Sequence, residues 1–330
     1  KDTAGNLGPS ATTGLFDIDT RAPTVNVFSL ANTPLLNGQT TTVNLIFSEP
    51  IDGSTFNSND DITVVNGSLS LMTSNDNKSW SGIFTPTADI EDSTNILTLQ
   101  TGSINDVLGN PLGDQVFTSN FIIDTLKPIV VSFTLTDTAL KAGDTAIVDL
   151  VFSEAVSEFS SDDDINTHGI GSLSTMTSSN NINWSGTFTP STDLSGGTTN
   201  ILTLNNTYTD LLGNTGVSIT TTQFAIDTLP VSVLTFTLSD TSLKSGDTAT
   251  VTLNFSEPID TNTFSLSSTT FDPSGGTLSN LISNNNKDWT FTFTPTFDLE
   301  STKGKLTLNS TYKDTAGNLG PSATTGLFDI

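Results

Sequence analysis

The sequence of 330 residues contains no cysteine and a single histidine, His168. Without cysteine the chain forms no disulfide and offers no thiolate for catalysis or for zinc. One histidine excludes most Ser-His, Cys-His and histidine–metal sites. Lysine and arginine number only 10 against 35 acidic residues, giving a formal net charge of −25. The chain therefore lacks the basic clusters that nucleic acids and anionic membranes require, and its surface favours cations.

Long apolar runs are also missing from the sequence. No stretch approaches the roughly 20 apolar residues that a membrane-spanning helix needs. The first residues lack the basic segment followed by an apolar segment that marks a signal peptide. We expect no direct membrane insertion, and we expect any secretion signal to lie outside these residues.

Internal repetition is the strongest feature of the chain, and it sets the domain organisation. Copies of Phe-Ser-Glu begin at positions 47, 152 and 255, which are 105 and then 103 residues apart. Ile-Asp-Thr, a tryptophan followed by Phe-Thr-Pro, and a Gly-Asn pair recur at spacings of 103 to 105 residues. A spacing of this size predicts whole domains, namely residues 19–123, 124–226 and 227–330.

Residues 1–18 are identical in sequence to residues 313–330. We interpret them as the closing strand of a preceding repeat. The alternative is a donor strand that completes a sandwich in a neighbouring chain and so builds a filament. The sequence leaves both interpretations open.

The pattern within each repeat is that of an all-β domain. Residues 24–28, 42–47 and 200–204 alternate apolar side chains with Thr, Asn or Ser, as strands with one buried face do. Turn signals such as Asn37-Gly38 separate them. About seven strands in roughly 100 residues predict immunoglobulin-like β-sandwiches, arranged in tandem as a linear rod. We expect the recurring Trp80, Trp184 and Trp289 to pack in the cores.

The predicted strand order brings four segments together at one end of each repeat, the end at which the linker arrives. Acidic residues recur in all four segments. Calcium prefers six to eight oxygen ligands, which such a cluster of carboxylates supplies. We therefore predict Ca2+ sites at the domain junctions. The predicted ligands are Asp19, Asp124 and Asp227 of the linkers, Glu49, Glu154 and Glu257 of Phe-Ser-Glu, Asp60, Asp61, Asp162 and Asp163 of the following loop, and Asp106, Asp210 and Asp314 of Asp-x-x-Gly-Asn.

The combination of Asp-Thr-x-x-Pro, Phe-Ser-Glu, Asp-x-x-Gly-Asn and a closing Ile-Asp-Thr resembles the Ig-like extender repeats of bacterial giant surface adhesins, of the biofilm-associated and RTX types. The resemblance covers essentially the whole chain. It implies a non-enzymatic stalk on the bacterial cell surface, stiffened by calcium, whose partners are neighbouring repeats of the same array. Matched by position, it implies the ligands Asp124, Glu154, Asp162, Asp163 and Asp210, with their counterparts.

Two other functions stay open at this point. One is a self-assembling fibre of copies of the chain joined through residues 1–18, and the other is an adhesive module that binds a glycan or a protein. Repeat 3 also departs from the pattern, because Ser267, Ser268 and Thr269 replace the acids after Phe-Ser-Glu. We therefore expect weaker calcium binding at the start of repeat 3.

Overall fold

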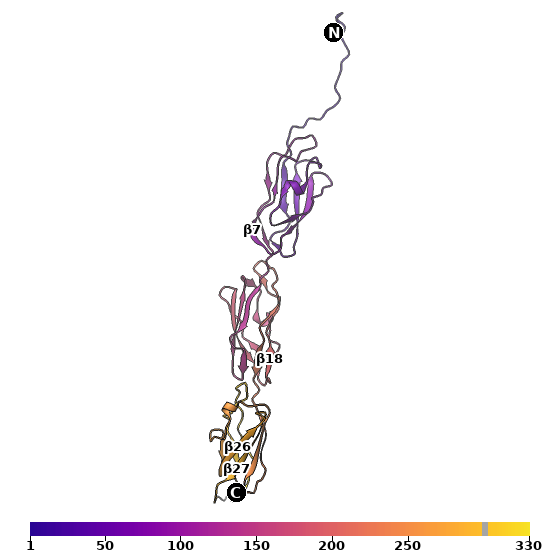
Figure 1. Ribbon diagram of the computed structural model, residues 1–330. Coiled ribbons are helices and arrows are strands. Elements are labelled where there is room, and N and C mark those ends of the chain that lie inside the picture. Colours follow the sequence, from indigo (N-terminus) through magenta and orange to yellow (C-terminus); the bar gives the residue numbers. More distant parts are fainter. Residues whose placement is uncertain (299–302) are drawn as a thin grey trace. The chain divides into compact units, whose positions relative to one another are not determined.

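The computed structural model describes residues 1–298 and 303–330, and the chain divides into two compact units. One unit comprises Lys1–Lys127 with Leu211–Asn214, and the other comprises Pro128–Asp210 with Thr215–Ile330. The first unit contains repeat 1, and the second contains repeats 2 and 3 apart from residues 124–127 and 211–214 (Figure 1). Residues 1–20 form no strand and are exposed.

Repeat 1 is a pair of facing β-layers with one short helix. Its first layer has the strand order β1-β3-β6-β5, and its second layer consists of the sheets β2-β10-β7 and β4-β8-β9. The elements are β1 (Val25–Leu30), β2 (Leu35–Leu36), β3 (Thr41–Phe47), α1 (Ser58–Asp61), β4 (Ile62–Thr63), β5 (Gly67–Leu69), β6 (Ser79–Pro86), β7 (Glu91–Asn95), β8 (Thr98–Leu99), β9 (Val116–Phe117) and β10 (Phe121–Asp124).

Repeat 2 has the same topology. The order β11-β13-β17-β16 forms one layer, and β12-β22-β18, β15-β19-β21 and the pair β14-β20 form the other. The elements are β11 (Val130–Leu135), β12 (Ala139–Lys141), β13 (Ala146–Phe152), β14 (Val156–Ser157), α2 (Ser161–Asp164), β15 (Ile165–Asn166), β16 (Gly171–Leu173), β17 (Asn183–Pro190), β18 (Gly197–Asn200), β19 (Thr203–Leu204), β20 (Thr209–Asp210), β21 (Ile219–Thr220) and β22 (Phe224–Asp227).

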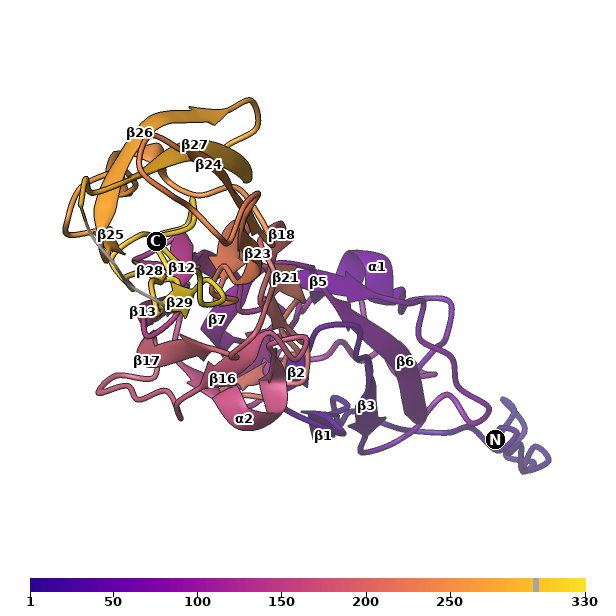
Figure 2. The same cartoon turned by 90° about the horizontal axis from the view of Figure 1, so that it is seen from below.

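Repeat 3 keeps the four-stranded layer β23-β24-β27-β26, in which β24, β27 and β26 lie side by side (Figure 2). Its second described layer is β25-β28-β29. The elements are β23 (Val233–Leu238), β24 (Ala249–Phe255), η1 (Thr261–Thr263), β25 (Phe271–Pro273), β26 (Gly276–Ser283), β27 (Asp288–Pro295), β28 (Leu306–Leu308) and β29 (Ala323–Thr324).

Strict alternation of side chains places each core. Along β3, every second residue from Thr41 to Phe47 is buried, and β13 and β24 show the same alternation. This period of two gives each long strand one apolar face toward the opposite layer. The all-β prediction is confirmed, since the two α-helices of the described residues are only four residues long and the 3-10 helix η1 only three. No helix in the described part of the chain is long and apolar enough to cross a membrane.

Each recurring tryptophan packs against a phenylalanine of the same repeat. Trp80 lies 4.8 Å from Phe56 between ring centroids, and Phe159–Trp184 and Phe264–Trp289 repeat the contact at 4.8 and 4.9 Å. Trp289 is 7% exposed, and the indole nitrogens of all three tryptophans are buried. The predicted packing role of the tryptophans is confirmed.

One pair of contacting core residues differs between the repeats, and the changes in size of its two members compensate each other. Tyr312 is fully buried, and a Cβ added at Gly320 would lie 2.2 Å from its ring, so only glycine fits there. Repeat 2 has the same pair as Tyr208 and Gly216. Repeat 1 instead has Ile104 and Leu112 at the equivalent places, joined by the same backbone hydrogen bond. The larger leucine offsets the smaller isoleucine, so the core volume is conserved.

Candidate metal centre at the start of each repeat

Each residue of the Phe-Ser-Glu motif has a different structural role. Phe255 ends β24 and is fully buried in the core of repeat 3. The next residue, Ser256, accepts a hydrogen bond at its Oγ from the backbone N–H of Ser232, 2.9 Å away, where the chain enters the repeat. Ser48 and Ser153 accept the equivalent bonds from Thr24 and Ile129. With phenylalanine and serine fixed in this way, the glutamate that follows is directed at the incoming linker.

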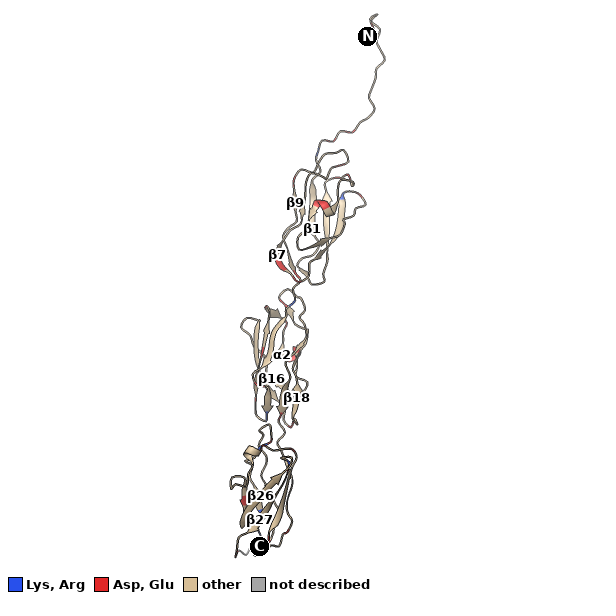
Figure 3. Ribbon diagram, viewed as in Figure 1, with Lys and Arg blue, Asp and Glu red and all other residues tan. Residues whose placement is uncertain are grey.

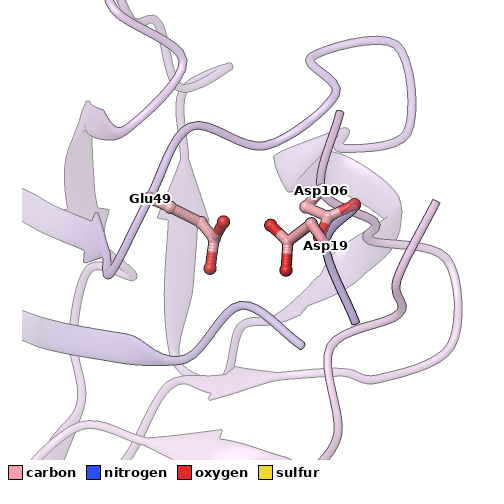
Figure 4. A group of neighbouring side chains, drawn as sticks. All are labelled: Asp19, Glu49 and Asp106. Carbon is pink, nitrogen blue, oxygen red and sulfur yellow. The ribbon is translucent and has the colours of Figure 1, made fainter. Parts of the chain in front are cut away.

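Two acidic triads result from this arrangement. In repeat 1 the triad is Asp19, Glu49 and Asp106, and in repeat 3 it is Asp227, Glu257 and Asp314. In each triad, one carboxylate oxygen per residue lies within 4.8 Å of the others. Figure 4 shows the three side chains of repeat 1 facing one another from three separate segments. The triads thus join a linker residue, a residue after a long strand and a loop residue.

The repeat 3 triad concentrates negative charge in a partly buried place. Burial raises the pKa of Glu257, and the carboxylates of Asp227 and Asp314 raise it further, while Lys287 lowers it. Burial likewise raises the pKa of Asp227, with Asp314 contributing to the shift. Both shifts show that the protein charges around the triad do not neutralise its carboxylates.

The loop aspartate of each triad is held by its own loop. We call residues 106–110, 210–214 and 314–318 the closing loops. Asp314 Oδ1 accepts hydrogen bonds from the backbone N–H groups of Ala316, Gly317 and Asn318, and its Oδ2 accepts one from Asn318 Nδ2 at 2.9 Å. Oδ2 therefore keeps one lone pair for another partner.

Equivalent bonds recur in repeat 1, and they affect the pKa of the loop aspartate. Asp106 accepts from the backbone of Leu108 and Asn110, and from the Asn110 side chain at 2.7 Å. The side-chain bond from Asn110 is the largest cause that lowers the pKa of Asp106, despite its burial. The closing loop thus keeps this carboxylate ionised and oriented.

The other aspartates predicted as ligands occupy short helices. Asp60 and Asp61 lie in α1, and Asp162 and Asp163 in α2, which Figure 3 shows in red. Asp61 accepts from the Asn57 backbone at 2.7 Å and from the Ser103 hydroxyl, so it caps its own helix. The structure does not place Asp60 or Asp61 in the repeat 1 triad. The predicted loop is therefore a helical turn in both repeats.

In repeat 2 the corresponding acidic residues lie at the ends of strands or just after them. Asp124 ends β10 and is buried, Glu154 follows β13, and Asp210 ends β20 and is buried. Asp124 belongs to the first compact unit, and Glu154 and Asp210 belong to the second. In the sequence of the repeats, these three residues hold the positions that the triad residues hold in repeats 1 and 3.

Sequence reasoning missed several polar residues that hold the linker. The threonine of Ile-Asp-Thr is one: Thr228 accepts from the Leu194 backbone at 3.0 Å and donates to Ser191 O at 2.7 Å. Thr125 makes the same pair of bonds with Ile90 and Thr87. The asparagines of the recurring Gly-Asn pairs hold it too, by donating to the linker carbonyls of Asp19, Asp124 and Asp227, a role that the motif did not predict. Recurrence of Ile-Asp-Thr at the repeat spacing was the signal that could have identified the threonine.

Comparison with known proteins agrees with the fold. Bacterial Ig-like domains match residues 19–122, 124–226 and 227–329. Similar solved structures include eight N-terminal Ig domains of Down Syndrome Cell Adhesion Molecule (10% identity, TM-score 0.31, 92% of this chain and 41% of that chain). An endo-fucoidan hydrolase of glycoside hydrolase family 107 is also similar (14% identity, TM-score 0.21, 89% of this chain and 42% of that chain). So is the Yersinia pseudotuberculosis adhesin InvE (13% identity, TM-score 0.25, 81% of this chain and 73% of that chain).

The chain thus spans less than half the length of the first two of these structures, and their low TM-scores carry no functional argument. A search of curated proteins found no match. The family match, by contrast, covers nearly every residue after the first 18 and indicates no catalytic family. The predicted tandem Ig-like sandwiches are confirmed, and the chain belongs to the family of bacterial Ig-like domains, of which it contains three in tandem.

Proposed function

We propose that the chain is an extender segment of a bacterial surface adhesin or fibre, and that its acidic triads bind Ca2+ where the chain enters each repeat. Tandem bacterial Ig-like domains are consistent with such a stalk. The proposal places the protein outside the cell, at the bacterial surface. It assigns the chain no catalytic role.

The brevity of the linker between repeats 2 and 3 carries the extender proposal. Thr228 is bound to the loop of repeat 2, and Leu229 donates its backbone N–H to Leu194 O of the same repeat. Val231 is already fully buried in the core of repeat 3, and the N–H of Ser232 is bound to Ser256. Only Pro230 lies between the two sets of contacts, and proline fixes its own φ. A linker of this kind favours a stiff connection over a flexible one.

The chemistry of the triads supports the calcium part of the proposal. Three carboxylates within 4.8 Å are hard oxygen ligands of the kind that calcium prefers. Glu257 makes no hydrogen bond among the described residues, and Asp314 Oδ2 has a lone pair left, so both can contribute an oxygen. A cavity of about 310 Å³, lined by Asp227, Thr315 and Ala316 among others, adjoins the triad and has room for water ligands. Repeat 3 would bind calcium through its triad alone, because it has Ser267, Ser268 and Thr269 where the other repeats have acids after Phe-Ser-Glu.

Small-angle X-ray scattering in calcium and in chelator tests the proposal. We expect the chain to be extended, and to have a larger maximum dimension and less flexibility in calcium. A chain with Glu49, Glu154 and Glu257 all replaced by glutamine serves as the control, and calcium should not change its scattering. Equal profiles in calcium and chelator would refute the calcium part. Dimensions of a compact globule in both conditions would refute the extender.

The identity of residues 1–18 with residues 313–330 favours donor-strand assembly as a second candidate. In repeat 3 the segment forms β29 and buries Phe328, whereas the equivalent Phe16 is 71% exposed. A second chain could therefore insert residues 1–18 into repeat 3 in place of residues 313–330. Because the two segments have the same sequence, they would bind repeat 3 with the same contacts. The chain's own segment 313–330 therefore stays in place unless the concentration of second chains reaches its effective concentration, which is roughly millimolar. Concentration-dependent light scattering, with and without residues 1–18, separates this candidate from the extender.

A further inference from the structure

A tight turn recurs in each repeat, directly after β2 and β12 in repeats 1 and 2 and between β23 and β24 in repeat 3. We call residues 36–39, 141–144 and 244–247 the first turns. Each is closed by a backbone hydrogen bond from its fourth residue to its first, as from Asp144 N to Lys141 O. Its third residue is a glycine at positive φ, 85° for Gly143, and its second residue is not at positive φ. This is a type II turn, in which the N–H of the second residue makes no bond within the turn.

That N–H has a partner in the following repeat. Ala142 of repeat 2 donates its backbone N–H to Oδ1 of Asn318, in the closing loop of repeat 3, at 2.8 Å. Asn37 donates in the same way to Asn214 Oδ1, also at 2.8 Å. The same geometry therefore occurs at two places in the chain, although the turn residue is alanine in one and asparagine in the other.

The asparagine uses its other end on the linker. Asn318 Nδ2 donates to the backbone carbonyl of Asp227 at 2.9 Å and to Asp314 Oδ2 at 2.9 Å. The Asn318 side chain is buried, with 3% exposure. Asn214 Nδ2 donates to Asp124 O at 3.1 Å, the equivalent linker carbonyl. Only a side-chain amide offers both an acceptor and donors in this space, since aspartate has no donor.

The neighbouring glycine lies beside the first turn of the preceding repeat. A Cβ added at Gly317 would lie 3.3 Å from Lys141 Cδ, and Gly317 is itself at a φ of 99°. Lys141 is held in place by an ion pair with Asp144 at 2.8 Å. The Gly-Asn pair of the closing loop is thus matched to the first turn of the preceding repeat.

We propose that the first turn of each repeat is a docking surface for the closing-loop asparagine of the next repeat, and that this asparagine fixes the preceding repeat and the linker together without a cation. The contacts that define the surface are the turn N–H, the linker carbonyl and the glycine beside the asparagine. The partner is an Ig-like repeat whose closing loop ends in Gly-Asn. The inference does not depend on the proposed calcium sites, because no triad carboxylate contacts the first turn N–H.

The variant Ala142→Pro tests the docking surface with little change to the turn. Proline is favoured at the second position of a type II turn, and the preceding Lys141 is in a strand, as proline requires. The substitution removes the N–H that Asn318 accepts and leaves the other bonds of Asn318 in place. Ser245→Pro is the matched control, because Ser245 holds the same turn position in repeat 3 and its N–H has no partner among the described residues.

Pulsed electron–electron resonance between spin labels on repeats 2 and 3 provides the measurement. Ser172→Cys and Thr277→Cys place the labels at exposed, equivalent positions on β16 and β26, and the chain has no other cysteine. All samples contain chelator, so the result is independent of calcium. A neutral hydrogen bond of typical strength corresponds to about a fivefold larger share of undocked arrangements in Ala142→Pro.

The outcomes decide the proposal in either direction. A broader distance distribution in Ala142→Pro, with Ser245→Pro equal to the parent, supports it. Equal distributions in all three chains overturn it. Asn318→Asp, which keeps the acceptor and loses both donor bonds, should broaden the distribution further. Tryptophan fluorescence unfolding confirms that each variant is folded before its distribution is interpreted. A failure of calcium to change the scattering would leave this result unaffected, so the two proposals fail separately.

Discussion

Replacing Glu257 with glutamine should have opposite effects on the stability of repeat 3 in chelator and in calcium. The substitution keeps the shape of the side chain and removes one of three charges that lie within 4.8 Å of one another. At that separation each pair of charges repels by about 1 kcal/mol in water and by about 3.5 kcal/mol at an effective dielectric constant of about 20. Solvent screens the two partly exposed carboxylates of the triad, so we expect Glu257→Gln to raise the free energy of unfolding by about 1 kcal/mol in chelator.

Calcium should reverse this order. A ligand at 100 times its dissociation constant stabilises the folded state by about 2.7 kcal/mol. Loss of one of three carboxylates should weaken binding about 100-fold, so the variant should gain only about 0.4 kcal/mol at the same calcium concentration. The parent chain therefore becomes the more stable of the two, by about 1 kcal/mol.

The assay needs a signal from repeat 3 alone, because three repeats do not unfold as one two-state system. Each repeat has one tryptophan, so a background with Trp80→Phe and Trp184→Phe leaves Trp289 as the reporter. Urea unfolding of this background then gives the stability of repeat 3 in calcium and in chelator. Asp272→Asn, on the exposed strand residue Asp272 of the same repeat, controls for the change in net charge.

Two results would refute the reasoning. If Glu257→Gln destabilises repeat 3 in chelator, then the triad carboxylates do not repel one another as the raised pKa values of Glu257 and Asp227 require. If calcium stabilises the parent and Glu257→Gln equally, the ion does not bind at the triad. A calcium effect that Asp272→Asn also removes would point to general screening.

Three further predictions use the same tryptophan reporter. In chelator, the raised pKa of Glu257 means that folding favours its protonated form, so this contribution to stability is present below a pH of about 4 and is lost as the pH rises through the folded pKa. The parent should therefore lose more stability than Glu257→Gln as the pH rises from about 4 through the folded pKa of Glu257. Parallel pH profiles of the two chains would contradict this. Tyr312→Ile should cost about 3 kcal/mol, because it removes a buried ring and leaves Pro321 O without its 2.9 Å hydrogen bond. Adding Gly320→Leu, which copies Ile104 and Leu112, should recover at least about 1 kcal/mol, and a double variant less stable than the single one would disprove the compensation. Gly276→Ala should cost about 2 kcal/mol, since its Cβ would lie 2.3 Å from the Phe293 ring, and urea midpoints equal to the parent's would contradict this.

Local structure at the triads could be predicted from the sequence. Residues 2–6 have the same sequence as the closing loop at 314–318 but no sandwich around them. Asp2 still accepts hydrogen bonds from the Ala4 and Asn6 backbone and from the Asn6 side chain at 2.9 Å, as Asp314 does in repeat 3. A short aspartate and an asparagine four residues later satisfy each other without tertiary help. Alternation and recurrence likewise determined the all-β repeats and their spacing.

Which acids meet was decided only by the tertiary structure. Glu49 and Asp61 are only 12 residues apart in sequence, yet Glu49 joins the triad, while Asp61 turns to the Asn57 backbone and Ser103. An alternating pattern assigns a residue to a face of a strand, but it does not show that the next loop coils into a helix whose N-terminal N–H groups attract nearby carboxylates. The bond from Ala142 to Asn318 spans 176 residues, and only the packing of one repeat against the next brings its two atoms together.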